Sequence, residues 1–427
     1  MISLLIITFI AGYLLIAFEH AIKINKSAIA LITGVLCWSV YSIFSPDKSL
    51  VNQQLNEHLG SLSGILFFLL GAMTIVELID SHDGFEIITS RITQTDKRKL
   101  LWIVAFITFF LSAVLDNLTT TIVVVSLLRK LINNQKDRLL FTGMVVVAAN
   151  AGGAWTPIGD VTTTMLWLGG QITTFNIMLK LFLPSLVCLI VPLLVLSIRF
   201  KGTIHRPNPV KPKTNQNLST KHQSFVFFSG ILILMLVPIF KTVTHLPPYL
   251  GILAGLGLLW VLTEVIHGKK DEKVKSTFSV VQALRKIDTA SILFFFGILI
   301  SIAALQSSGI LTGLAGWLSH SIANVNIIVL SLGILSSVVD NVPLVAATQG
   351  MYKLSQFPQD SYFWEFLAYC VGTGGSMLII GSAAGVAAMG MEKINFFWYL
   401  KKISLLAFLG YFAGALVYIL QHLFLGL

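Results

Sequence analysis

The sequence is poor in charged residues and in cysteine. Only 11% of its 427 residues are charged, whereas 55% are apolar, so a water-soluble globular domain is a poor interpretation. The three cysteines, Cys37, Cys188 and Cys370, each stand alone inside an apolar run, and they indicate neither a disulfide framework nor a metal site. The chain has only 19 Asp and Glu residues, so an acidic residue within an apolar run indicates a candidate functional site.

Long apolar runs make up most of the chain instead. A helix needs about 20 apolar residues to cross roughly 30 Å of hydrocarbon, and such runs recur along the whole sequence. The first run lacks a preceding basic segment, so we interpret it as a helix rather than a cleaved signal peptide. The sequence therefore predicts an all-α polytopic membrane protein with about ten full crossings, near residues 2–18, 27–44, 62–79, 139–168, 176–198, 225–240, 248–266, 290–305, 362–389 and 404–425.

Two further apolar stretches, 100–132 and 322–352, are each split by an Asp-Asn pair. The pairs are Asp116-Asn117 and Asp340-Asn341. Two full crossings and a turn need roughly 40 residues, and the first stretch is shorter than that. We therefore expect two re-entrant helical hairpins, each entering and leaving by one side of the membrane; the alternative is two full crossings at each place.

The basic residues favour one orientation of this topology. If the chain starts outside, all but four of the 29 Lys and Arg residues fall in loops on the cytoplasmic face, the exceptions being Lys48, Lys180, Lys241 and Lys353. The net charge of +10 therefore indicates a membrane orientation rather than a nucleic-acid partner. A hairpin and a double crossing both return the chain to its starting side, so charge does not choose between them.

The chain repeats the same landmarks in each half. A polar linker, 199–223, separates residues 1–198 from residues 224–427. Asp116 follows "ILFFLLG" (65–71) by 45 residues, and Asp340 follows "ILFFFG" (292–297) by 43. The glycine-rich segments "NAGGAWTPIGD" and "GTGGSMLIIGS" then follow at similar spacing. Because each half makes five full passages, the second begins on the opposite face, which predicts inverted repeats and a secondary transporter.

The glycine-rich segments predict that the helices at 139–168 and 362–389 are broken. In the first, Gly152, Gly153 and Gly159 loosen the backbone, and Pro157 removes a hydrogen-bond donor. A broken helix survives in a membrane only where protein or a wet cavity satisfies its freed amides and carbonyls. These breaks therefore mark a candidate ion site near the bilayer centre.

The buried acids predict the chemistry of that site. An Asp at the middle of a membrane segment costs about 2.5 to 3.5 kcal/mol on insertion, so we expect Asp116, Asp340 and Asp160 to have functional roles. Burial favours the protonated acid and a bound cation favours the carboxylate, so one group holds H⁺ or Na⁺ (or Li⁺), not both. We expect Na⁺ on Asp116, Asn117, Asp340 and Asn341, with alternating access to a cavity between the three aspartates.

Neutral oxygens around the acids complete the candidate set, because hard cations prefer oxygen ligands. These residues are Asn150, Ser112, Thr119, Thr156, Thr162, Thr163, Ser336, Ser337, Ser376 and Ser382. Glu77 is either a second protonatable site or an interfacial residue beside Asp80. No cofactor is expected; the transported ions and the lipid bilayer are the predicted partners.

Four segments carry a resemblance to a known family. "LDNLTTTIVVVSLLRKL", "NAGGAWTPIGDVTTTMLWLGGQI", "VDNVPLVAAT" and "GTGGSMLIIGSAAGVAAMG" resemble the NhaD-type sodium/proton antiporters of the ion transporter superfamily. The resemblance implies a bacterial inner-membrane protein that exchanges Na⁺ or Li⁺ for H⁺, with a scaffold that forms a homodimer and a moving unit of hairpins and broken helices. It also implies functional roles for residues Asp116, Asn117, Asn150, Asp160, Thr162, Thr163, Ser112 and Asn341.

Three other functions are alternatives to a sodium/proton antiporter. A sodium-coupled carboxylate symporter of the same superfamily carries Ser-Asn-Thr at its hairpin tips, but here Asp stands in the Ser position twice and would repel an anion. An oxyanion exporter is a weaker option. An intramembrane aspartyl protease would use two Asp residues without repeated landmarks around them. In addition, "TPIGD" does not match the Gly-x-Gly-Asp motif of such proteases.

Overall fold

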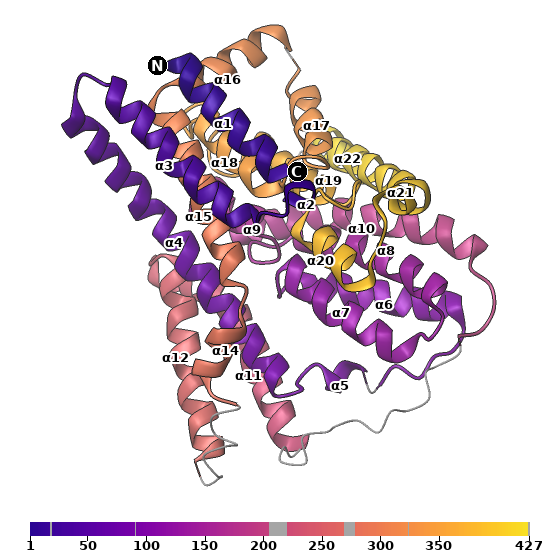
Figure 1. The fold of residues 1–427 in the computed structure, drawn as a ribbon. Coiled ribbons are helices and arrows are strands. Elements are labelled where there is room, and N and C mark those ends of the chain that lie inside the picture. The colour runs from indigo at the N-terminus through magenta and orange to yellow at the C-terminus, as the bar shows by residue number, and fades with distance from the viewer. Residues whose placement is uncertain (18, 90, 205–219, 269–277, 323, 426–427) are drawn as a thin grey trace.

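The structure is a computed structural model that describes residues 1–17, 19–89, 91–204, 220–268, 278–322 and 324–425. Of the expected linker at 199–223, residues 205–219 lie outside the described residues. The described chain is almost entirely helical (Figure 1), as the apolar runs predicted. Its principal helices are α1 (Ile2–Ala17), α3 (Lys26–Phe44), α4 (Lys48–Ser81), α6 (Lys97–Ser112), α7 (Asn117–Leu131), α8 (Gln135–Gly153), α9 (Val161–Leu168), α10 (Thr174–Arg199), α11 (Thr220–Thr244), α12 (Pro248–His267), α14 (Val280–Lys286), α15 (Thr289–Ser307), α16 (Ile310–Ser321), α17 (Val325–Leu335), α18 (Asn341–Met351), α19 (Tyr362–Gly374), α20 (Ala383–Glu392) and α22 (Leu405–Leu425).

Within the described ranges, seven helices are long and apolar enough to cross a membrane. They correspond to α3, α4, α10, α11, α12, α15 and the C-terminal helix that ends with α22. The other three expected crossings coincide with the shorter α1 and with the interrupted pairs α8–α9 and α19–α20. The protein is therefore a polytopic helical membrane protein.

Several element bounds differ from the sequence prediction. Helix α4 begins at Lys48, well before the crossing expected at 62–79, because its first turns are polar and escape a search for apolar runs. Short helices α2 (Glu19–Ile22), α5 (Glu86–Thr89) and α14, and the longer α16, were not anticipated. A four-residue helix, α21 (Phe396–Tyr399), and a π-helical turn, η1 (Leu400–Ser404), precede α22.

Both stretches that carry an Asp-Asn pair are helix–break–helix units. Residues 113–116 separate α6 from α7, and residues 336–340 separate α17 from α18. At 1.5 Å per residue, the 16-residue α6 extends about 24 Å, which is less than the roughly 30 Å of a hydrocarbon core. The lengths agree with the expected hairpins, whose re-entrant path through a membrane stays a prediction.

The helices pack in two groups. Helix α3 packs on α1 and α15, and α4 packs on α12, α11 and α15, which together form a first group. The second group contains α6 to α9, the pair α10 and α22, and α17 to α20. Figure 1 shows α3, α4 and α12 on the left and α6, α8 and α10 on the right. The groups meet where α15, with α16 packed on it, contacts α18 and where α4 contacts α9, so the candidate site residues at the helix breaks lie beside this junction.

Candidate functional site

Four helices begin at the breaks, and each begins with a polar cap. Asp116 caps α7, Asp160 caps α9 and Asp340 caps α18 through side-chain oxygens that accept backbone N–H groups. Ser382 caps α20 in the same way. A helix N-terminus carries partial positive charge, so these caps satisfy the first amides and oppose that charge. Asp160 and Ser382 both end a break, seven residues after Gly153 and Gly375 respectively.

The side chain of Asp160 is the meeting point of the two Asp-Asn segments. Asn117 Nδ2 donates to Asp160 Oδ2 at 2.7 Å. Asn341 Nδ2 lies 3.4 Å from Asp160 Oδ1 and 3.3 Å from Oδ2. Asp160, Asn117 and Asn341 are only 1%, 3% and 3% exposed. Residues from both halves of the chain thus enclose one carboxylate.

The amide network extends to the two broken helices. Asn117 Nδ2 also lies 3.2 Å from Asn150 Oδ1, its acceptor on α8. Asn150 Nδ2 donates to Ser382 Oγ at 3.1 Å and to the carbonyl of Val146 at 2.9 Å. The network therefore links α7, α8 and α20 in one buried layer around Asp160.

The threonines after Asp160 hold its loop. The backbone N–H of Thr162 donates to Asp160 Oδ1 at 2.9 Å, and Thr163 Oγ1 donates to the Asp160 carbonyl at 2.9 Å. Thr162 Oγ1 is fully buried and forms no hydrogen bond of normal geometry with a described residue. An unsatisfied buried oxygen beside a carboxylate is a suitable additional ligand for a small cation.

Five of the expected hydroxyl ligands donate hydrogen bonds to backbone carbonyl groups at the breaks. Ser112 Oγ donates to Ala149 O at 2.7 Å, and Ser336 Oγ donates to Val371 O at 2.9 Å, at equivalent places in the two halves. The others act similarly: Thr156 donates to Ala113 O, Ser337 to Ile334 O and Ser376 to Thr373 O. These hydrogen bonds hold the backbone at the breaks. Among the described residues, no hydrogen bond joins these five side chains to Asp160.

The arrangement differs from the expected one around Asp116 and Asp340. Both Asp116 oxygens accept from Thr119, at 2.8 Å from its N–H and 2.6 Å from its hydroxyl. Asp340 lies 4.0 Å from the ammonium of Lys26 on α3. Across the described residues, no three His, Cys, Asp or Glu side chains are grouped closely enough to hold a metal ion. The structure places amides of both Asp-Asn segments against Asp160, and the expected cavity between the three aspartates stays a prediction.

Glu77 is placed elsewhere. Its carboxylate pairs with Lys286 of α14 at 3.2 Å, and no hydrogen bond or ion pair among the described residues joins it to the Asp160 network. The sequence pattern does not identify Lys26 as a site residue, because it assigns Lys26 to the basic residues of a loop. Its neighbours, Asp340 and the ring of Phe294, which lies 4.4 Å from its ammonium, are distant in sequence, so no local signal could have identified it.

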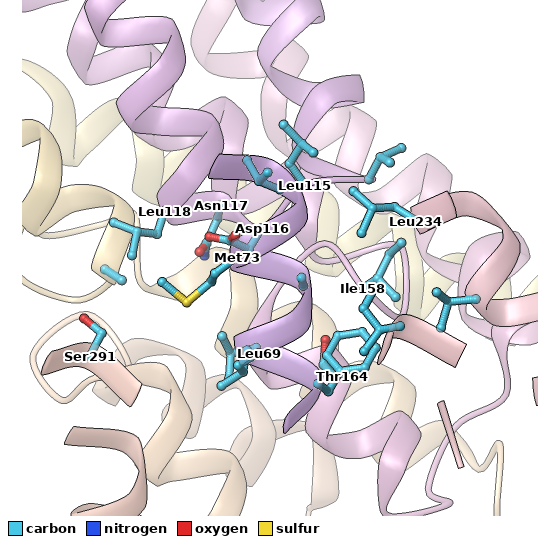
Figure 2. Close-up of a pocket in the computed structure, with 18 of the residues that line it drawn as sticks. Leu69, Met73, Leu115, Asp116, Asn117, Leu118, Ile158, Thr164, Leu234 and Ser291 are labelled. Atoms are coloured by element: carbon cyan, nitrogen blue, oxygen red, sulfur yellow. The ribbon is translucent and has the colours of Figure 1, made fainter. Parts of the chain in front are cut away.

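A small cavity opens beside the first Asp-Asn pair. It has a volume of about 40 Å³, and Figure 2 shows Asp116 and Asn117 among apolar side chains such as Met73 and Leu118. The cavity lies between α4 of the first group and α7 and α9 of the second. A water molecule occupies about 30 Å³ in the liquid, so the space suits a small ion or one water molecule rather than an organic anion.

A second cavity continues along the same two helices. It has a volume of about 150 Å³ and is lined by Asp80 and Asp83 near the end of α4, by Glu86, and by Ile122 on α7, with Lys130 at its edge. Val76 and Leu118 line the first cavity, and Asp80 and Ile122, one turn further along α4 and α7, line the second. The small cavity and the acidic one are therefore offset by about one helical turn along α4 and α7.

Known proteins share sequence similarity with most of this chain. The family model described as citrate transporter matches residues 13–372. Sodium/proton antiporter 2 of Arabidopsis thaliana is 50% identical over 97% of this chain and 98% of its own length, and sodium/proton antiporter 1 of the same plant is 52% identical over 96% and 71%. The Na⁺/H⁺ antiporter NhaD of Alkalimonas amylolytica is 30% identical over 96% of this chain and 89% of its own.

Proposed function

Because the chain belongs to the NhaD-type sodium/proton antiporter family of the ion transporter superfamily, we propose that it exchanges Na⁺ or Li⁺ for H⁺ across a membrane. The observation that carries this proposal is the buried carboxylate of Asp160, which receives amide groups from both Asp-Asn segments. One carboxylate supplies one negative charge, and that charge accepts either a proton or a monovalent cation. The competition couples the two ions.

The surrounding residues support binding of a dehydrated cation. When Na⁺ replaces the amide hydrogens at Asp160, rotation of the side chains of Asn117 and Asn341 presents their carbonyl oxygens to the ion. Thr162 Oγ1 adds a hydroxyl oxygen that has no other well-formed hydrogen bond among the described residues. An all-oxygen set of this kind matches the preference of hard cations. Asp116 and Asp340, at the caps of α7 and α18, add negative charge nearby.

We propose that Na⁺ reaches Asp160 between α4 and α7. The acidic cavity at Asp80 and Asp83 concentrates cations, and the small cavity at Asp116 leads to Asn117. Access then alternates as the second helix group, with its hairpins and broken helices, shifts against the first. The two groups contact each other along α15, α16 and α4, and we propose that the movement takes place at this junction.

The finer assignments rest on the sequence. We propose a bacterial cytoplasmic membrane, two inverted repeats and an N-terminus outside, because the basic loops then face the cytoplasm. Relatives named as sodium/proton antiporters occur in Alkalimonas amylolytica and in Arabidopsis thaliana. The homodimer follows from the family resemblance. Labelling of the variants Lys48→Cys and Lys136→Cys from each side of the membrane tests the orientation. Light scattering of the purified protein tests the dimer.

A sodium-coupled carboxylate symporter is the second candidate, favoured by the citrate-transporter description of the family model. In that mechanism, free helix N-termini would receive the anion. Here Asp116, Asp160 and Asp340 cap three of the four N-termini, and the cavity beside them holds about 40 Å³. Both features disfavour a carboxylate substrate.

Purified protein in liposomes separates the two functions. A pH dye inside the vesicles reports proton movement when Na⁺, Li⁺ or K⁺ is added outside, and radiolabelled citrate reports uptake of the anion. We expect Na⁺- and Li⁺-driven proton movement that citrate does not change, and no citrate accumulation. Sodium-dependent citrate uptake without proton counter-movement would replace this proposal with the symporter.

A further inference from the structure

A basic pocket lies away from the Asp160 site, where the ends of several helices of the second group converge. It has a volume of about 440 Å³ and brings together the starts of α6 and α8, the end of α10 and the turn η1 before α22. Pockets of about 300 to 1,000 Å³ are typical of small-molecule sites. Its lining consists of Lys97, Asp137, Leu140, Val195, Leu196, Phe200, Lys201, Lys401, Lys402, Leu405 and Leu406.

The charges of this pocket are not balanced. Lys97 pairs with Asp137 at 2.8 Å, and each of these two side chains is about one-fifth exposed or less. Lys201, Lys401 and Lys402 have no acidic partner among the described residues. The pocket therefore carries an excess of three positive charges around a concave surface, which favours an anion.

The backbone at Lys401 and Lys402 presents these two ammonium groups from an unusual turn. Residues Leu400–Ser404 form a π-helical turn between α21 and α22. Such turns are rare, and they occur disproportionately at functional sites because they displace side chains from the regular helical path. Two adjacent lysines in this turn both reach the same pocket.

Apolar side chains form the other wall. Leu196 near the end of α10 is buried, whereas Leu405 at the start of α22 is 66% exposed on a helix apolar enough to cross a membrane. The pocket thus joins a basic rim to a surface suited to hydrocarbon. A soluble anion would use only the rim, whereas a phospholipid would use both parts.

We propose that this pocket binds the phosphate of an anionic phospholipid, with Lys201, Lys401 and Lys402 at the headgroup and an acyl chain along Leu405 and Leu406. Basic pockets between membrane helices on the cytoplasmic side are suited to such headgroups. The lipid would hold the end of α10 and the start of α22 at the membrane surface. This inference does not depend on which ion the protein transports.

Native mass spectrometry of the full-length protein in detergent tests the proposal. The protein is titrated with dioleoylphosphatidylglycerol or dioleoylphosphatidylcholine, and the retained lipid is counted. The test variant is Lys401→Gln/Lys402→Gln, and the matched control is Arg98→Gln/Lys99→Gln, an adjacent exposed basic pair at the start of α6 that does not line the pocket. Lys201→Gln, which lies outside any helix, provides a second test if the double variant elutes as aggregate.

We expect one phosphatidylglycerol to be retained in preference to phosphatidylcholine. At about 1 kcal/mol for each lysine, the Lys401/Lys402 variant should bind it roughly 10- to 30-fold more weakly, and Lys201→Gln roughly fivefold. The control should bind as the unaltered protein does. Equal loss in the control, equal retention of both lipids, or complete displacement by millimolar inorganic phosphate would each overturn the proposal, the last by indicating a site for a free anion.

Discussion

The amide of Asn341 lies 3.3 Å from Asp160 Oδ2, the oxygen to which Asn117 donates at 2.7 Å. The tips of two separate helix–break–helix units thus meet on one carboxylate. Neither aspartate of the two Asp-Asn pairs takes this central place, since both cap the helices that follow them. The asymmetry between Asp160 in one half and Ser382 at the equivalent position in the other leaves a single charged group at the centre.

The two asparagines are expected to contribute unequally. Asn117→Ala removes the shorter contact to Asp160 and the contact to Asn150, whereas Asn341→Ala removes only longer contacts. Because the asparagine that lies closer to Asp160 would supply the nearer carbonyl oxygen to the ion, we predict that Asn117→Ala raises the half-saturating Na⁺ concentration about tenfold, which corresponds to about 1.4 kcal/mol. Asn341→Ala should raise it about threefold. Initial rates of exchange in liposomes measure both, and the reverse order would contradict the geometry.

Lys26 and Asp340 connect the two helix groups. Lys26→Gln should slow exchange, because it leaves the Asp340 carboxylate, whose side chain is 16% exposed, without its counter-charge. Lys26→Arg should preserve the rate. The double variant Lys26→Gln/Asp340→Asn should be more active than the sum of the two single effects predicts, with a coupling of about 1 kcal/mol in rate. Lys23→Gln, an exposed lysine in the same connection, is the control; additive effects of Lys26 and Asp340 would show that the pair is incidental.

Glu392 is expected to hold the second group together. Its carboxylate is 1% exposed and pairs with Arg129 of α7 at 2.6 Å and with Arg138 of α8 at 2.7 Å. Glu392→Gln should lower the thermal unfolding midpoint by several degrees, because two arginines lose their shared partner. Lys130→Gln, which breaks the exposed pair with Glu86, should change the midpoint by about 1 °C or less. Equal shifts in the two variants would remove the buried cluster from the account of stability.

Asp83 provides a test in pH. It lies just after α4, and burial raises the pKa of its carboxyl above the usual value, with the nearby Glu86 adding to the effect. An acid whose pKa is raised by folding binds its proton more tightly in the folded state, so it costs stability once the pH rises through that range. Asp83→Asn should therefore raise the unfolding midpoint slightly at pH 7, by less than about 2 °C, because the group is partly exposed. The gain should vanish below about pH 4, where both states are protonated; a gain that persists there would have another cause.

The sequence identified the breaks but not how they meet. Glycine, proline and Asp-Asn pairs predicted the interruptions because these residues act locally on the backbone, and the helix breaks lie at these residues. The sequence did not predict that both segments meet at Asp160. It does not show whether the aspartate that precedes a helix or the asparagine that begins it will point toward the other half of the chain. Only the structure shows that Asp116 turns back to Thr119 while Asn117 reaches Asp160.

The polar start of α4 and the partner of Lys26 were missed for related reasons. A search for apolar runs cannot detect a helix that continues as "KSLVNQQLNEHLG" beyond its apolar part. Charge counting assigned Lys26 to a loop, although it stands in the first turn of α3 beside Asp340. The first feature is a local sequence that an apolar search overlooks, whereas the Lys26–Asp340 pair depends on packing between distant segments.

The most direct test of the central claim is Na⁺-driven proton movement in liposomes that contain the Asp160→Asn protein. The substitution keeps the size of the side chain but removes the single charge at the centre of the amide network. Asp288→Asn, which alters an exposed aspartate that caps α15 in the same way, is the matched control. We predict that Asp160→Asn falls to the level of empty liposomes while Asp288→Asn exchanges normally; exchange by Asp160→Asn at the unaltered rate would contradict the account.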